Sequence, residues 1–385
     1  MSKRARITFL SHNVSGNCMF RTALLYRALE PYFNVEIVGF DRGGGIWGPL
    51  RNEGLNIRHE PYGGWPVFLR SCWRILKSLR ADVVIASKPR LPSFGLGLLN
   101  RLIRGTPVIV DNEDDELAMT RPPKHIRLPR KISFHLSNPD AHLPTQLLHR
   151  LVRRADQVFV VSTHFQRLHG GTVIPHGLPP PSVPGKDEIS RLRSELGLGD
   201  AFVVVFVGTP RAHKGIVETL DAAAASNIPG IRVVVVGVSP NDAYTNDLSE
   251  RYGDLLLRVP PVPSAEVPSY LALGNVTVLA QQASEESMGQ MPAKLTDAML
   301  SGIPIIATSV SDIPLYLEDC GIVLDTASPE AIATALRWVH AHPENARALG
   351  KLGQARANEL LTDKAIARIM LPLVNQILDR RQGSQ

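Results

Sequence analysis

The sequence predicts an α/β protein made of two doubly wound, Rossmann-like domains that face each other across a cleft. The length of 385 residues suits two domains, because a single domain usually contains about 100–200 residues. Short apolar runs alternate with helical patterns, and the runs lack the polar alternation of a sheet with one face in water. The alternation restarts after a proline-rich stretch, which indicates two parallel sheets with helices on both faces.

The first predicted domain covers residues 1–180. Helical periodicity is present at Met19–Leu29, Val67–Leu79, Phe94–Ile103 and Gln146–Arg153. Apolar runs between these helices predict strands at Ile7–Ser11, Val35–Phe40, Val83–Ala86, Val108–Val110, Val158–Val161 and Thr172–Pro175. Strands separated by helices in this way are typical of a parallel sheet.

A second domain is predicted at residues 186–364. Residues 178–185 contain four prolines, which cannot continue a helix or a central strand, and we interpret them as an interdomain linker. Beyond the linker, strands are predicted at Phe202–Val207, Ile231–Val236, Leu255–Val259, Val276–Leu279, Ile303–Thr308 and Gly321–Leu324. Helices are predicted at Gly215–Ala225, Val267–Leu273, Ala293–Leu300 and Pro329–His340. A last helical stretch, within residues 365–385, could pack back onto the first domain.

The composition is that of a globular protein with a basic balance. Apolar residues make up 44% of the chain, and the formal net charge is +6. Such a charge suits diphosphates, an anionic membrane surface or nucleic acid. We do not expect nucleic acid as a partner, because the sequence has no recognised motif that binds it.

Cysteine usage and hydropathy point to the cytoplasm. The three cysteines are far apart and form no CxxC pair, which argues against a disulfide framework or a zinc site. No stretch approaches the ~20 apolar residues of a membrane span. Peripheral membrane contact is possible through residues 121–154, a basic stretch with interleaved apolar side chains. That stretch could equally cover an acceptor or form an ordinary basic surface.

The strongest local signal is a glycine-bounded basic loop between a predicted strand and a predicted helix. Gly208 lets the backbone turn and approach a ligand. Arg211 and Lys214 place two cations beside a helix N-terminus, which favours binding of a pyrophosphate. A solvated basic loop is the alternative, and the position at a strand end favours the phosphate site.

The second signal is the stretch from Met291 to Pro304. Pro292 suits the first helical position. The unpaired N–H groups of the next turn, together with the helix dipole, form an anion site near Lys294. Asp297 lies about one and a half turns further, where its carboxylate can accept hydrogen bonds from two vicinal hydroxyls, as on a ribose. Taken alone, a surface helix with an N-terminal proline explains the stretch equally well.

Together the two signals resemble glycosyltransferase family 4 of the GT-B fold. That family carries a glycine–arginine–lysine–glycine loop and a proline–lysine–leucine–x–glutamate helix followed by glycine–x–proline. The matching residues here are Gly208, Arg211, Lys214, Gly215, Pro292, Lys294, Leu295, Asp297, Gly302 and Pro304. Weaker similarities, at Ser15-Gly16, Asp82–Lys88 and Thr172–Gly177, extend the resemblance over nearly the whole chain.

The resemblance implies a retaining hexosyltransferase that uses a nucleotide diphosphate sugar as co-substrate and needs no metal or other cofactor. The acceptor would be a hydroxyl of a carbohydrate, lipid-linked or small molecule. By the same likeness, Arg211 and Lys214 hold the diphosphate and stabilise the departing nucleotide. Asp297 binds ribose, and the loop at Ser15 and Gly16 faces the phosphate and the acceptor.

The sequence departs from the family at one point. Many members have two glutamates eight residues apart on this element, whereas here Asp297 is the shorter homologue and the earlier position is Gly289. Glu285 or Glu286 could replace the missing contact to the donor sugar. The departure motivates one alternative, a catalytically silent GT-B partner or regulatory protein. A pseudo-glycosyltransferase that couples non-sugar cyclitols through the same nucleotide site is a further alternative.

An acidic run, Asp111–Glu116, follows the strand Val108–Val110 and therefore lies at the edge of the first domain that faces the cleft. Glu113 and Asp114 are further catalytic candidates, and with Asn112 they could meet hydroxyls or an amine of the acceptor. Clustered carboxylates also suit a divalent metal, and a solvated loop that caps the next helix is the third reading. Lys88, at the preceding strand end, and His176, at the hinge, could line the cleft or be structural.

Overall fold

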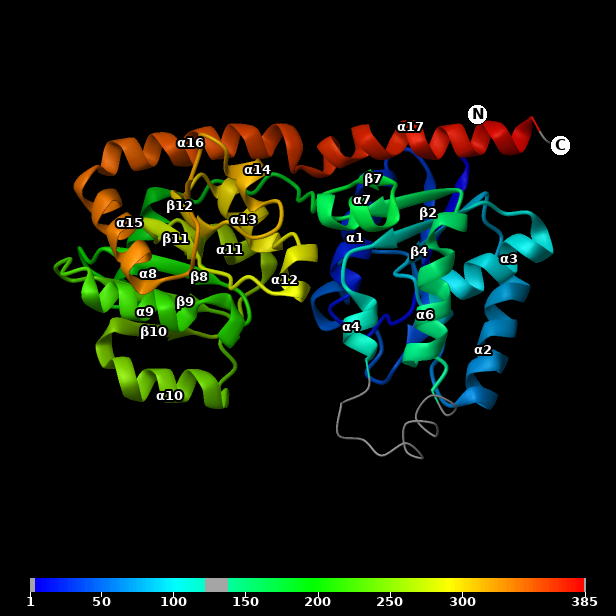
Figure 1. Cartoon of the computed structure of the whole chain (residues 1–385), viewed down its shortest axis with the longest axis horizontal. Coiled ribbons are helices and arrows are strands. Elements are labelled where there is room, and N and C mark those ends of the chain that lie inside the picture. Colours follow the sequence, from blue (N-terminus) through cyan, green and yellow to red (C-terminus); the bar gives the residue numbers. More distant parts are fainter. Residues whose placement is uncertain (1–3, 122–137, 384–385) are drawn as a thin grey trace. The chain divides into compact units, whose positions relative to one another are not determined.

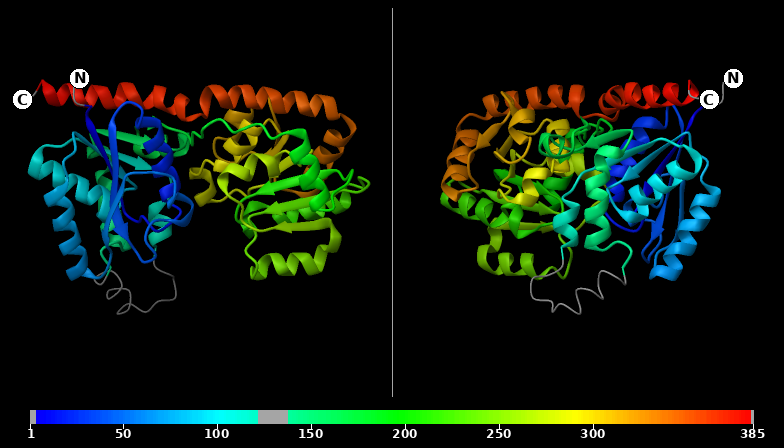
Figure 2. Two further views of the ribbon diagram at one scale, coloured as in Figure 1. Left: turned by 180° about the vertical axis from the view of Figure 1, so that it is seen from behind. Right: turned by 45° about the vertical axis from the view of Figure 1, so that its right-hand side comes forward.

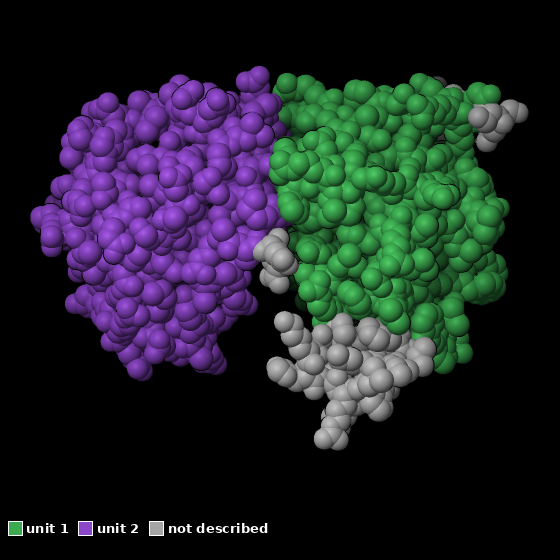
Figure 3. All heavy atoms as spheres, in the orientation of Figure 1, with its two compact units in different colours: residues 1–177, 363–385 green, residues 178–362 purple. Residues whose placement is uncertain are grey.

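The structure, a computed structural model, describes residues 4–121 and 138–383 (Figure 1). The chain divides into two compact units (Figure 3). Unit 1 contains Met1–Gly177 together with Asp363–Gln385, and unit 2 contains Leu178–Thr362. The predicted linker residues 178–185 belong to unit 2, where the Leu178 amide donates to the Leu361 carbonyl oxygen at 3.0 Å. The two segments at which the chain passes between units therefore lie side by side.

Unit 1 is built on a seven-stranded parallel sheet with the order β3-β2-β1-β4-β5-β6-β7. Its strands are β1 (Arg6–Ser11), β2 (Asn34–Asp41), β3 (Ile57–Pro61), β4 (Val83–Ser87), β5 (Val108–Asn112), β6 (Gln157–Val160) and β7 (Thr172–Val173). Its helices are α1 (Met19–Leu29), α2 (Trp65–Ser78), α3 (Leu96–Arg104), α4 (Glu116–Thr120), α6 (His142–Leu151), α7 (Thr163–His169) and α17 (Asp363–Gln382).

Helices cover both faces of this sheet. The chain moves in one direction along the sheet through α1 and in the other through α2 and α3, so right-handed crossovers place α1 opposite α2 and α3. The C-terminal helix α17 packs against α1 and contributes Ile366, Met370 and Val374 to the core under that face. Figure 2 shows α2 and α3 side by side in blue and cyan.

Unit 2 contains a six-stranded parallel sheet with the order β10-β9-β8-β11-β12-β13. Its strands are β8 (Val203–Val207), β9 (Arg232–Val236), β10 (Leu256–Val259), β11 (Val276–Leu279), β12 (Ile305–Thr308) and β13 (Ile322–Leu324). Its helices are α8 (Lys186–Glu195), α9 (Ile216–Ala225), α10 (Ala243–Tyr252), α11 (Val267–Leu271), α12 (Glu285–Gly289), α13 (Ala293–Ser301), α14 (Ile313–Leu317), α15 (Pro329–Ala341) and α16 (Pro343–Leu360).

Local chemistry explains where several of these elements begin. The Ser328 hydroxyl accepts a hydrogen bond from the Ala331 amide and caps α15, and the Asp242 carboxylate caps α10 through the Thr245 amide. The strands β8 and β9 are almost entirely buried valine, as expected for a sheet covered on both faces. The prediction of two doubly wound parallel domains is confirmed.

Candidate functional site

The strand order of unit 2 reverses between β8 and β11. In doubly wound sheets the loops that leave two such strands diverge at their carboxyl ends, and ligands bind in the crevice between them. The loop after β8 carries Gly208, Arg211 and Lys214, and the segment after β11 leads to α13. These two segments are joined here, because the backbone N–H of Gln282 donates to the His213 carbonyl oxygen at 3.1 Å.

Two glycines let these segments pack closely. Gly208 has a φ of +125°, and a Cβ atom at this position would lie 2.5 Å from Cε of Lys294. Gly215 has a φ of +70°, and a Cβ atom there would collide with the Ala280 carbonyl oxygen. Both positions combine a backbone conformation that favours glycine with no room for a side chain. The close neighbour of Gly208 is therefore the Lys294 side chain from α13.

Lys214 and Lys294 bring two ammonium groups together at this edge. The Lys214 Nζ donates to the Thr209 carbonyl oxygen at 2.7 Å, and the Lys294 Nζ lies 4.2 Å from the centre of the Phe206 ring. Burial, reinforced by the neighbouring Lys214 charge, holds the pKa of Lys294 well below its usual value. Burial also lowers the pKa of Lys214. A bound anion would relieve the repulsion between the two groups.

Arg211 is the third cation of this cluster. Its side chain is 57% exposed and lies 3.9 Å from the Asp242 carboxylate, while Nη1 donates to the Pro210 carbonyl oxygen at 2.9 Å. Its charge contributes to the lowered pKa of Lys214, so the two residues are electrostatic neighbours. The structure therefore groups Arg211, Lys214 and Lys294, hereafter the cation cluster, at the carboxyl ends of β8 and β11.

Helix α13 presents its amino end beside the cation cluster. The helix begins at Ala293, and Pro292 is its N-cap with extended backbone, at φ −66° and ψ 118°. The prediction that Pro292 occupies the first helical position is thus wrong by one residue. Pro292 makes no side-chain hydrogen bond to this end of the helix, and the first-turn N–H groups of a helix are suited to a bound anion. The side chains of Met291 and Leu295 are buried and anchor the start of α13 in the protein interior.

Asp297 follows Lys294 by one turn and is partly buried. Burial raises the pKa of its carboxyl to about 7, and the Lys294 charge opposes this shift. Glu286, the other acidic candidate in unit 2, lies in the first turn of α12, but its side chain lies outside the described part of the structure.

In unit 1 the strand order reverses between β1 and β4. Ser15 and Gly16 lie in the loop after β1, where the Ser15 hydroxyl donates to Asp41 at 2.8 Å. A Cβ atom on Gly16 would lie 2.7 Å from Nδ2 of Asn13, so this loop is tightly folded. Lys88 follows β4, and the acidic run follows β5, so the topology brings most of the unit 1 candidates to one edge.

The acidic run is neutralised by buried cations. Lys88 has a left-handed backbone, with a φ of +71°, and its Nζ lies 2.5 Å from Asp114, 2.9 Å from Glu116 and 3.4 Å from Glu113. Arg90 pairs with Glu116, and the Arg21 guanidinium donates to both Asp111 oxygens, at 2.7 and 2.8 Å. A buried carboxylate persists where such partners offset its desolvation.

These pairs test the solvated-loop reading of the acidic run. The solvated-loop reading is wrong for Asp111 and Glu116, which are buried. The part of that reading that predicted a helix cap is correct, because the Asp115 side chain accepts hydrogen bonds from the Leu117 and Ala118 backbone amides at the start of α4. No set of three or more His, Cys, Asp or Glu side chains in the described residues is arranged to hold a metal ion. Binding of an acceptor by Glu113 and Asp114 stays a prediction.

Several buried polar groups at this edge of unit 1 keep hydrogen-bonding capacity. Asn112 is fully buried, and both polar atoms of its side chain lack a partner among the described residues. The same holds for Nδ1 of His12, which follows β1. Burial raises the pKa of Glu113 to about 8. The His176 ring lies 6.0 Å from the Phe20 ring, on the side of α1.

The sequence reasoning missed one cation and one carboxylate that hold this edge together. Arg21 lies in a helix that carries no motif, and Asp140, which pairs with Arg42 and Arg90, follows a stretch outside the described residues. Arginine within the apolar pattern of α1 was the available signal, because a buried arginine needs a buried carboxylate.

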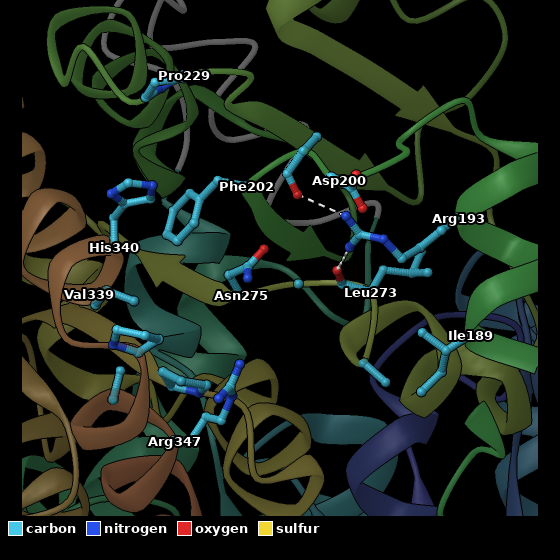
Figure 4. A pocket seen from close by; sticks show the side chains of 16 residues that line it. Ile189, Arg193, Asp200, Phe202, Pro229, Leu273, Asn275, Val339, His340 and Arg347 are labelled. Carbon is cyan, nitrogen blue, oxygen red and sulfur yellow. Dashed lines mark hydrogen bonds between the residues drawn. The ribbon is translucent and has the colours of Figure 1, made fainter.

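A separate pocket of about 440 Å³ lies at the opposite, amino edge of the unit 2 sheet (Figure 4). The Arg193 guanidinium donates there to the carbonyl oxygens of Leu273 and Ala201 at 2.7 and 2.8 Å, and the Asn275 side chain accepts from the Val203 amide. These polar groups are already engaged in joining the sheet edge, so this pocket is distinct from the cation cluster.

Comparison with known proteins gives matches for both units. Residues 21–177 match the model of the glycosyl transferase 4-like domain, and residues 188–356 match that of glycosyl transferases group 1. The D-rhamnosyltransferase WbpZ of Pseudomonas aeruginosa is 28% identical over 232 residues, 57% of this chain and 58% of that protein. A D-inositol 3-phosphate glycosyltransferase of Segniliparus rotundus is 30% identical over 177 residues, 43% of this chain and 38% of that protein.

The matched region thus spans less than two thirds of either relative's length. Among solved structures, HepE from Anabaena in complex with UDP superposes with a TM-score of 0.74 at 18% identity, covering 96% of this chain and 100% of that one. At this identity the likeness shows the fold, which is the GT-B arrangement of two Rossmann-like domains.

Proposed function

Because the chain belongs to the family 4-like glycosyltransferases of the GT-B fold, we propose that it transfers a sugar from a nucleotide diphosphate sugar to a hydroxyl group of an acceptor. The observation that carries this proposal is the cation cluster beside the amino end of α13 in unit 2. The named relatives are glycosyltransferases, and the solved HepE structure contains UDP. A nucleoside diphosphate is the leaving group that such a site is suited to hold.

The cation cluster meets the main electrostatic demand of this reaction. Negative charge develops on the β-phosphate as the bond to the sugar breaks, and preorganised cations stabilise that charge most effectively when water is scarce. Lys214 and Lys294 repel each other without a ligand, so a diphosphate between them converts a repulsive arrangement into charge-assisted hydrogen bonds. Arg211, whose side chain is mostly exposed, would add a third contact to the phosphates.

The remaining roles follow the same geometry. Asp297 would accept hydrogen bonds from the ribose hydroxyls, one turn beyond Lys294 on α13. In unit 1, Glu113 and the polar atoms that lack a partner among the described residues, those of the Asn112 side chain and Nδ1 of His12, would bind the acceptor, which is a carbohydrate, a lipid-linked or a small molecule. We also propose that the anomeric configuration is retained, that the transferred group is a hexose, and that the cation cluster replaces a metal ion.

The test is turnover with a panel of UDP-, GDP-, ADP- and dTDP-sugars, after thermal-shift screening has identified the nucleotide that binds. Arg211→Ala should lower kcat by about 10²–10³-fold, by analogy with the loss of one oxyanion donor. Lys351→Ala, which removes an exposed cation of α16, is the matched control and should retain wild-type turnover. Turnover of Arg211→Ala within a few-fold of wild type would refute the proposed role.

Two further measurements separate the finer parts of the proposal. Nuclear magnetic resonance of the anomeric proton in the product distinguishes retention from inversion, and turnover in EDTA tests independence from metal. Gly289, at the position of a family glutamate, favours the silent partner as the alternative function. Binding of a nucleotide-sugar with neither transfer nor hydrolysis across the panel would support that alternative.

A further inference from the structure

One flank of unit 1 exposes large apolar side chains on two neighbouring helices. On α2 these are Leu69 and Trp73, the latter 60% exposed. On α3 they are Leu99, Leu102 and Ile103, and Leu102 is 84% exposed. A contiguous apolar patch on a soluble surface usually marks a site that another surface covers. These five residues are called the α2–α3 flank below.

The five side chains form one surface, because α2 and α3 pack side by side (Figure 2). Arg104 of α3 donates to the Leu76 and Leu79 carbonyl oxygens at the end of α2, at 2.7 and 2.8 Å. The opposite faces of both helices are buried against the sheet by Phe68, Ser71, Ile75, Leu96, Gly97 and Asn100. The α2–α3 flank is therefore additional to the face that holds the helices in place.

The flank lies within a strongly basic segment. Residues 61–110 contain a single acidic residue, Asp82, which follows α2. The same residues contain eight cations: Arg70, Arg74, Lys77, Arg80, Lys88, Arg90, Arg101 and Arg104. On α2 the cations follow the outer side of the helix, next to the apolar stripe, and the Lys77 Nζ lies 5.1 Å from the Trp73 ring centre. Acidic groups from outside the segment pair with four of these cations: with Lys88 and Arg90, which are buried, and with Arg74 and Arg101 through Glu60 and Asp156. The exposed cations Arg70, Lys77 and Arg80 remain on α2 and directly after it.

We propose that the α2–α3 flank docks on the surface of an anionic lipid bilayer. Leucine and tryptophan on one stripe with arginine and lysine beside it is the pattern of helices that lie in the plane of a membrane interface. Tryptophan prefers this depth, because its ring is apolar and its N–H reaches water or headgroups. The long basic side chains extend from the same stripe to lipid phosphates.

The bilayer explains both features of the flank at once. It offers apolar chains below a continuous layer of negative charge, whereas a protein partner would need an acidic rim around an apolar centre of matching outline. The docking is peripheral: in the part of the chain that the structure describes, each helix is too short or too polar to cross a bilayer.

This surface differs from the one suggested by the sequence. Residues 122–137 of the predicted membrane segment 121–154 lie outside the described residues, and membrane contact through that segment stays a prediction. The docking proposal does not depend on the proposed function, although it would place the enzyme near a lipid-linked acceptor.

The test is flotation of the full chain with vesicles of phosphatidylcholine, with and without phosphatidylglycerol. We expect binding to the anionic vesicles that weakens as salt is raised. The double variant Trp73→Gln/Leu102→Gln should bind at least about 10-fold more weakly, from the apolar area that it removes. The double variant Arg70→Gln/Lys77→Gln should lose about 25-fold, at about five-fold for each cation.

The matched control is Lys351→Gln/Leu352→Gln. It removes an exposed cation and a leucine that is 56% exposed from α16 in unit 2, and it should float like the wild type. Turnover of soluble substrates and the melting temperature should be unchanged in all three variants, which separates failure of docking from failure of the proposed function. Equal flotation of wild type and both flank variants would overturn the proposal. A dimer in solution that the flank variants convert to monomer would overturn it as well, in favour of an interface between two copies.

Discussion

At the scale of single residues, Lys294 has a strongly perturbed pKa in unit 2. Its ammonium group is held between Lys214, the face of Phe206 and the backbone of Gly208, and Asp297 is the carboxylate that acts on it. The pKa of a lysine in such a place is lowered, because both burial and a like charge disfavour the protonated form. A diphosphate bound beside it would favour the protonated form and raise the pKa of Lys294 again.

Nucleotide binding should therefore be accompanied by proton uptake. In the ligand-free protein Lys294 loses its proton at a pH below the usual lysine range, so affinity for a nucleoside diphosphate should fall as the pH rises above that point. Calorimetry with UDP or GDP at pH 8, in buffers of different ionisation enthalpy, measures the uptake directly. Lys294→Met should abolish most of it, and a wild-type titration without proton uptake would contradict this account.

Glu113 gives a second prediction at this scale. Its effect on folding stability should depend on pH in the opposite direction from that of a carboxylate with a lowered pKa. Its pKa is raised to about 8 in the folded protein, so the folded state keeps a proton that the unfolded state releases from about pH 4.5 upward. Stability is therefore lost as the pH rises through this window. The free energy of unfolding of Glu113→Gln minus that of wild type should be larger at pH 8 than at pH 5. The increase should be on the order of 1–2 kcal/mol. Urea unfolding at the two pH values checks this, and an unchanged difference would contradict it.

At the scale of elements, the position of α13 depends on α16. The Gln354 side chain donates to the Leu300 carbonyl oxygen at 2.8 Å and so caps the end of α13. Gly350 brings the two elements together, because a Cβ atom there would overlap the Gly302 carbonyl oxygen. The helix that carries Lys294 and Asp297 is thus held from its far end by a helix some fifty residues later in the chain.

Gly350→Ala should destabilise the protein by about 1–3 kcal/mol, because the added methyl group enters a filled contact. Gly353→Ala is the matched control on the same helix. A Cβ atom there would make ordinary contact, 3.5 Å from the Cys320 carbonyl oxygen, so higher helix propensity should leave stability unchanged or raise it by up to ~1 kcal/mol. Equal melting temperatures of the two variants would show that the close contact between Gly350 and Gly302 contributes little to stability.

The same elements show where prediction from the sequence failed. The pattern of α16 was not recognised as helical, because two glycines interrupt an otherwise favourable stretch, and the structure uses Gly350 for close approach. The edge strand β3 was missed because its residues, IRHEP, are mostly polar and partly exposed, as is common at a sheet edge. The central strands were predicted correctly to within a few residues, since a buried parallel strand is apolar throughout.

At the scale of the whole molecule, unit 1 is completed by the end of the chain. Met370 of α17 is fully buried in the core beneath α1, and Ile366 and Val374 flank it. Residues from both ends of the sequence must therefore meet before this core can close. The contact makes the stability of unit 1 depend on a segment that follows the whole of unit 2.

Met370→Ala should cost about 2–5 kcal/mol, because it leaves a cavity in a packed core. Gln376→Ala, at an exposed position of the same helix, is the control and should change stability by less than about 0.5 kcal/mol. Circular dichroism during urea unfolding reports both. A Met370→Ala variant as stable as the control would mean that α17 contributes little to the core of unit 1.

The sequence by itself determined the two parallel sheets, the succession of their central strands and helices along the chain, and the basic loop at Gly208–Gly215. These follow from local signals, since apolar periodicity and glycine placement are set by neighbours in the chain. Only the tertiary structure decided that Lys88 neutralises the acidic run, that Lys294 joins Lys214, and that α2 and α3 present one apolar flank. Such pairings depend on which strand ends and helix faces become neighbours in space, and that is a property of the topology of the sheets.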